Sequence, residues 1–69
     1  MTILELENLV RDALGLDPAA EISPHEEWDS LDHFLVISKI QSEEANLAGN
    51  LDLSKATNFS KLSDVFFGG

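Results

Sequence analysis

The chain has 69 residues, which suffices for one small domain but leaves little room for an enclosed substrate pocket. Thirteen acidic residues against four Lys and Arg give a formal net charge of −9. Such a field repels nucleic-acid phosphates and anionic membranes, attracts partners with basic patches, and keeps a small protein soluble. The composition therefore disfavours an ordinary enzyme and a nucleic-acid- or membrane-binding protein.

Cysteine is absent. A small secreted domain would usually carry disulfides, so its absence favours a reducing cytoplasm. The N-terminus lacks the basic region and apolar stretch of a signal peptide, and no apolar run approaches the roughly 20 residues that span a bilayer. We expect a cytoplasmic monomer with a single domain over residues 1–69.

The first predicted element is a helix over residues 3–14. Thr2 and Glu5 form the pattern of a capping box, and Gly15 suits the left-handed position that ends a helix. The apolar residues between them fall at helical spacing: Leu6, Leu9, Val10, Ala13 and Leu14.

Residues 17–29 form a long connection that contains two prolines and lacks sustained periodicity. Connections of this length tend to be functional or to wrap around the domain. Ile22 and Trp28 are the predicted anchors of this segment to the core.

A second helix is predicted from Asp29 or Ser30, both good N-cap residues, to about residues 46–47. Asp32 adds negative charge to its first turn, where the helix dipole favours it. Its apolar residues form two groups on different faces. The first comprises Val36, Ile37, Ile40 and Leu47, and the second comprises Leu31, Phe34 and Leu35.

The second apolar group lies next to Ser30 and has two interpretations. A helix in a small bundle can be buried on two sides, which favours burial of Phe34 more than of Leu31 and Leu35. Alternatively, the group forms a partly exposed patch that meets partner enzymes or cargo.

The C-terminal part contains a predicted break at residues 48–50 and a short helix or turn within residues 51–56. Thr57 or Asn58 can then cap a last helix whose apolar residues share one face: Phe59, Leu62, Val65 and Phe66. No segment shows the alternation of a half-buried strand. The predicted class is all-α, with three main helices and a short fourth.

One stretch stands out at the junction of the long connection and the second helix: Glu27-Trp28-Asp29-Ser30-Leu31-Asp32-His33-Phe34. Its Asp-Ser-Leu at the head of an acidic second helix is similar to the acyl carrier proteins, in particular the small free-standing bacterial carriers. The similarity covers nearly the whole chain. It implies an acyl-carrier-like bundle of three or four helices with a long loop between helices 1 and 2.

The resemblance also implies a function. Ser30 would receive a 4′-phosphopantetheine arm from coenzyme A through a phosphopantetheinyl transferase. The arm would hold acyl or aminoacyl intermediates as thioesters, which a loading ligase attaches and downstream biosynthetic enzymes use. The carrier itself would not be an enzyme. The residues expected to dock partners are Asp29, Leu31, Asp32 and Leu35.

Three positions depart from the family pattern. Leu35 stands where a glutamate is common, Lys39 adds a positive charge in mid-helix, and Glu44 stands near an expected buried aromatic residue. The docking face is thus less acidic and more apolar than in the fatty-acid type, which suggests a specialised biosynthetic pathway.

Other functions stay open beside the carrier. The chain could be an unmodified acidic adaptor that docks a basic partner through Leu31, Phe34 and Leu35. The terminal Gly68-Gly69 also occurs in small ubiquitin-like modifiers, although those are β-rich and a frayed helix end is the ordinary explanation.

Ser30 also has a purely structural interpretation as an N-cap. A hydrolase based on Ser30 and His33 would need an orienting group and an oxyanion hole, and the G-x-S-x-G motif is absent. His25 and His33 lack the spacing of metal ligands, so no metal is expected.

Overall fold

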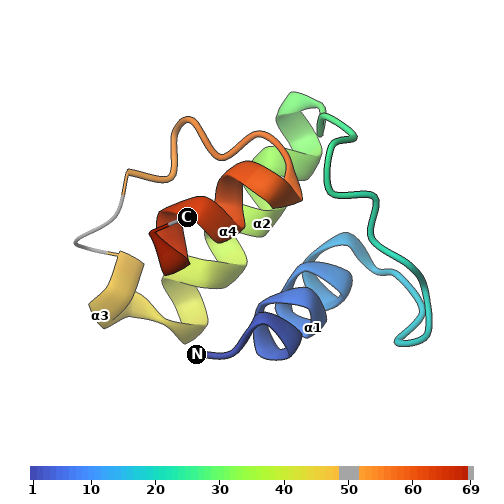
Figure 1. Cartoon of the computed structure of the whole chain (residues 1–69), viewed down its shortest axis with the longest axis horizontal. Coiled ribbons are helices and arrows are strands. Elements are labelled where there is room, and N and C mark those ends of the chain that lie inside the picture. Colours follow the sequence, from blue (N-terminus) through green and yellow to red (C-terminus); the bar gives the residue numbers. More distant parts are fainter. Residues whose placement is uncertain (49–51, 69) are drawn as a thin grey trace.

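The computed structural model describes residues 1–48 and 52–68. Within them it is helical and contains no strand, which confirms the predicted all-α class. Figure 1 shows how the long connection runs along one side of the molecule from the first helix back to the start of the second. The elements in chain order are α1 (Ile3–Leu14), α2 (Ser30–Glu43), α3 (Ala45–Ala48) and α4 (Phe59–Phe67).

Helix α1 has the predicted bounds because both of its ends are capped locally. Thr2 Oγ1 accepts the Glu5 N–H at 3.2 Å, and Glu5 Oε1 accepts the Thr2 N–H at 2.9 Å, so the capping box is formed. The backbone hydrogen bond from Thr2 lowers the pKa of Glu5 below its ordinary value. Gly15 ends the helix in the left-handed conformation at φ 70°.

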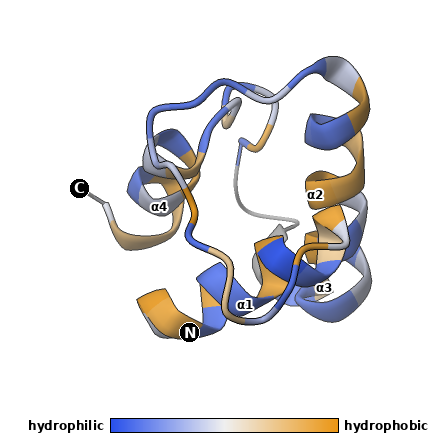
Figure 2. Ribbon diagram, turned by 90° about the vertical axis from the view of Figure 1, so that its right-hand side faces the viewer, coloured by the Kyte–Doolittle hydropathy of each residue, from blue (hydrophilic) through white to orange (hydrophobic). Residues whose placement is uncertain are grey.

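A single apolar core joins α1, α2, α4 and the segment that precedes α4. Ile22 and Trp28 pack against this core as predicted. Figure 2 shows α2 and α4 on opposite sides of the molecule, with α1 along the bottom and apolar and polar positions alternating along the helices. The buried residues are Leu6, Leu9, Val10, Val36, Ile40, Leu53, Ala56, Phe59 and Leu62.

Two basic side chains link neighbouring elements through a hydrogen bond and an ion pair. Arg11 Nε donates to the Ala20 carbonyl at 2.7 Å and ties the long connection to α1. Lys39 Nζ on α2 lies 2.5 Å from an Asp12 oxygen on α1. The hydrogen bond to Asp12 raises the pKa of Lys39. Lys39, a departure from the carrier pattern, therefore bridges the two longest helices.

The predicted end of the second helix at residues 46–47 is wrong. Helix α2 ends at Glu43, Glu44 adopts φ −129° and ψ 48°, and the short α3 follows. Glu43 is paired with Lys39 at 3.6 Å, but the carboxylate of Glu44 at the C-cap opposes the negative end of the helix dipole, and the last turn contains no basic residue. The predicted break at residues 48–50 is wrong at Ala48, which is the last residue of α3. Its other two residues, Gly49 and Asn50, and the side chain of Leu47 lie outside the described residues.

The segment before α4 forms a turn, because the Ala56 N–H donates to the Leu53 carbonyl at 3.1 Å. Asn58 then caps α4 as predicted, with its Oδ1 accepting the Lys61 N–H at 2.8 Å. Gly68 ends α4 in the left-handed conformation, and Gly69 lies outside the described residues. None of the helices in the described ranges has the length and apolar character needed to cross a membrane.

Candidate functional site

Ser30 is the first residue of α2 and is exposed to solvent. The N-cap is Asp29, whose Oδ1 accepts the Asp32 N–H at 2.8 Å. Ser30 is therefore not the capping residue, and its hydroxyl makes no hydrogen bond with any residue that the structure describes. Because its neighbour satisfies the helix end, the Ser30 hydroxyl is left accessible to a reacting partner.

A groove of about 380 Å³ runs from Ser30 along α2. One wall is built from α2 residues at helical spacing, and the other from Leu53 and Ser54. None of the lining residues is an aspartate, glutamate, lysine or arginine, although the chain as a whole is strongly acidic. The residues contributed by α2 are Ser30, His33, Phe34, Ile37 and Gln41.

His33 connects the two walls of this groove. Its Nε2 lies 3.1 Å from the Leu53 carbonyl oxygen. Since a carbonyl oxygen only accepts hydrogen bonds, this contact requires the proton on Nε2. His33 therefore holds the first turns of α2 against the segment leading to α4.

The apolar group beside Ser30 lies on the surface. Leu31, Phe34 and Leu35 are 63%, 64% and 38% exposed, so the predicted burial of Phe34 is wrong. The core face of α2 is formed by Val36 and Ile40 and packs against α1. Phe34 lies well away from that face at 100° per residue, and no second helix in the described ranges covers it. The three side chains form an exposed apolar patch, the interpretation that suits partner docking.

The residues expected to dock partners do not all share one surface. Leu31 and Leu35 are exposed and lie one helical turn apart, and Asp29 is exposed at the N-cap. Asp32 is half-buried and lines a different hollow, together with Glu26 of the long connection. The structure thus places Leu31 and Leu35 together and turns Asp32 toward α1 and the connection.

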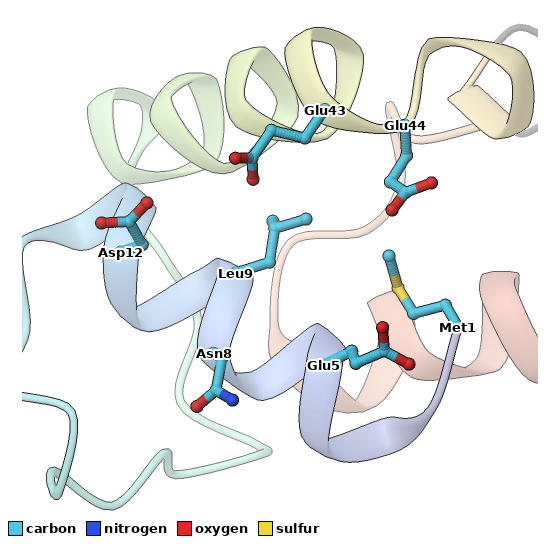
Figure 3. A pocket seen from close by; sticks show the side chains of 7 residues that line it. All are labelled: Met1, Glu5, Asn8, Leu9, Asp12, Glu43 and Glu44. Atoms are coloured by element: carbon cyan, nitrogen blue, oxygen red, sulfur yellow. The ribbon is translucent and has the colours of Figure 1, made fainter.

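A second, acidic hollow lies between α1 and the end of α2. Figure 3 shows carboxylates of both segments turned toward this space, with Leu9 and Met1 among its lining residues. Glu43 follows Ser30 by 43 − 30 = 13 residues, which at 1.5 Å per residue puts this hollow about 20 Å along α2 from Ser30. This hollow is not part of the Ser30 site. Its acidic side chains are Glu5, Asp12, Glu43 and Glu44.

Sequence reasoning missed several groove residues. Gln41 lies eleven positions after Ser30 on the same helical face, so the helical period contained that signal. Leu53 and Ser54 join the groove only through tertiary packing. Within residues 1–48 and 52–68, no three potential metal-ligating side chains gather closely enough to hold an ion.

Comparisons with protein-family models, with curated proteins and with solved structures found no match for this chain. The functional assignment therefore depends on the residues around Ser30, their geometry and the resemblance of their sequence to the acyl carrier proteins.

Proposed function

We propose that this chain is a carrier protein that holds acyl or aminoacyl intermediates as thioesters on a 4′-phosphopantetheine arm attached to Ser30. The observation that supports it most is the exposed Ser30 hydroxyl, which makes no hydrogen bond with the described residues. The Asp-Ser-Leu sequence supplies the chemical identity of the attachment. The proposal includes an acyl-carrier-like arrangement of the helices, a cytoplasmic location and a specialised biosynthetic pathway.

The residues at the start of α2 fit a phosphodiester on Ser30. The backbone N–H groups of Ser30 and Leu31 make no hydrogen bond with the described residues, so they can donate to phosphate oxygens at the positive end of the helix. The carboxylates of Asp29 and Asp32 oppose a second negative group. We assign the exposed Asp29 to recognition by basic surfaces, with an exposed phosphate that water solvates.

The groove next to Ser30 suits an uncharged chain that contains amides. Gln41 and Ser54 offer neutral hydrogen-bonding groups, and Ile37 and Leu53 offer apolar contact. An anionic arm would meet no cation in this groove, whereas the neutral part of a pantetheine chain needs none. The bound arm would supply a thiol, and this chain would position it.

The attachment step requires a nucleophilic oxygen and a docking surface from the carrier. Ser30 Oγ forms the new bond to a phosphorus atom of coenzyme A, the bond from that phosphorus to the nucleotide phosphate breaks, and the serine proton passes to a base of the transferase. The carrier supplies the nucleophilic oxygen and the docking surface, while the transferase supplies the catalytic groups. Loading ligases and downstream enzymes would use the same exposed end of α2.

Intact-mass measurement after coexpression with a broad-specificity phosphopantetheinyl transferase tests the proposal. The wild-type chain should gain the mass of one phosphopantetheine group, and Ser30→Ala should gain none. Ser42→Ala is the matched control, because Ser42 is an exposed serine on the same helix, and it should be modified like the wild type. A wild-type mass that stays unchanged would exclude the carrier function.

The exposed patch of Leu31, Phe34 and Leu35 favours a second candidate, an unmodified acidic adaptor with a basic partner. The two candidates differ in their dependence on Ser30. An adaptor would bind its partner equally well as Ser30→Ala, whereas a carrier loses its function with that hydroxyl.

A further inference from the structure

Glu27 lies three residues before Ser30. Its carboxylate is hydrogen-bonded by residues just before α4 and in the first turn of α4. Oε1 accepts hydrogen bonds from Thr57 Oγ1 at 2.8 Å and from Lys61 Nζ at 3.3 Å. Oε2 accepts a hydrogen bond from Asn58 Nδ2 at 2.5 Å. Both oxygens of an otherwise exposed carboxylate are therefore engaged by one short segment.

Asn58 makes this contact specific. Among the residues that the structure describes, Asn58 is the polar residue that is buried, with 6% of its surface exposed. Its Oδ1 accepts the Lys61 N–H and caps α4, while its Nδ2 donates to Glu27. A buried amide whose donor loses its acceptor is costly, so the side chain at position 27 is coupled to the start of α4.

Two backbone hydrogen bonds reinforce this junction. The Trp28 N–H donates to the Thr57 carbonyl at 2.8 Å, and the Ser60 N–H donates to the Pro24 carbonyl at 2.9 Å. The residues just before α2 are thereby held against the start of α4 from three positions. Since the Asp29 cap follows directly, this junction fixes the start of α2, and with it Ser30, relative to α4.

We infer that Glu27 is a positioning residue for the modification of Ser30, acting through Asn58 and Thr57. Glu27 does not contact the reacting hydroxyl, because its carboxylate is turned to the α4 side of the junction. The inference depends on the proposed carrier function. Glu26 provides the contrast, since its side chain makes no hydrogen bond with a described residue although it carries the same charge one position earlier.

A double-mutant cycle across positions 27 and 58 tests the inference. Glu27→Gln leaves a single acceptor oxygen, which can serve Asn58 or the Thr57 and Lys61 pair but not both, and Asn58→Asp places two carboxylates together. The double variant Glu27→Gln/Asn58→Asp restores one donor and one acceptor with their roles exchanged, and an aspartate still caps α4. We would measure kcat and KM for transfer of the arm by a purified transferase, with intact mass as the readout and at a temperature where all variants are folded by circular dichroism.

Each single variant should lower kcat by about three- to tenfold, the factor that corresponds to one hydrogen bond, and the double variant should return to within about twofold of the wild type by the same measure. The matched control Glu26→Gln should leave kcat unchanged. A Glu27→Gln variant with wild-type kcat, or a double variant as slow as the slower single one, would overturn the positioning role alone. An equal rise of KM in Glu27→Gln and Glu26→Gln would also overturn it. That pattern would show that the loss of any negative charge in this region weakens docking to the transferase. A wild-type chain that takes no arm overturns the carrier function itself.

Discussion

Asp29 Oδ1 accepts the backbone N–H of Asp32 at 2.8 Å, so the aspartate before the serine, and not the serine itself, caps α2. Asp29 and Ser30 therefore have different roles at the start of the helix. Asp29 satisfies an N–H that would otherwise lack a partner, and Ser30 keeps a hydroxyl with no structural task among the described residues. A carrier needs its attachment residue to be free in this way.

Replacing the cap should lower stability without touching the serine. Asp29→Ala should lower the free energy of unfolding by about 1 kcal/mol, the usual worth of an N-cap, as measured by urea denaturation. Asp29→Asn is the matched control, because it keeps a capping oxygen and removes the charge. It should stay close to the wild type in stability, and equal losses in both variants would show that charge rather than capping matters.

Ser30→Ala should separate function from stability. The hydroxyl makes no hydrogen bond with the described residues, so its removal should change the free energy of unfolding by less than about 0.5 kcal/mol. Thermal and urea denaturation of the unmodified proteins would measure this. A loss of more than about 1 kcal/mol would assign Ser30 a structural role, as a lost cap does.

The two faces of α2 should respond differently to truncation. Ile40 is fully buried, so Ile40→Val should cost about 0.5–1.5 kcal/mol, a large part of the roughly 3–5 kcal/mol that a core of this size supplies. Phe34 is 64% exposed, so Phe34→Ala should cost less than about 0.5 kcal/mol although it removes more atoms. Urea denaturation compares the two, and a larger loss for Phe34→Ala would place that ring in the core.

Glu27 should link stability to pH. The hydrogen bond from Thr57, followed by those from Lys61 and Asn58, lowers the pKa of Glu27 below its ordinary value of 4.5. A carboxylate with a lowered folded-state pKa contributes stability above its unfolded pKa, and that contribution is lost as pH falls through the folded value.

The difference in unfolding free energy between the wild type and Glu27→Gln should therefore be largest near neutral pH and shrink once the pH falls below the ordinary value of 4.5. Measuring the difference, rather than the wild type alone, removes the contribution of the other carboxylates. A difference that is constant from neutral to acid pH would argue against the contact in solution.

Local chemistry was sufficient to predict much of this fold. The bounds of α1 follow from Thr2, Glu5 and Gly15, and the caps of α2 and α4 each lie at one of the two adjacent candidates that the sequence offered. These features depend on neighbours within about four positions, and such short-range contacts are encoded in spacing and residue type. The end of α2 at Glu43 was missed because it depends on charge at the helix terminus rather than on the apolar pattern.

The amino-acid order alone also identified Ser30, its acidic flanks and the apolar group beside it, since these lie within one continuous stretch. Only the folded chain decided that Phe34 is exposed, that Leu53 completes the groove, and that Glu27 is tied to Asn58, 31 positions away. Exposure and long-range hydrogen bonds depend on which helix faces remain uncovered after packing. A helical period gives the direction of a side chain, but it does not say which element lies opposite.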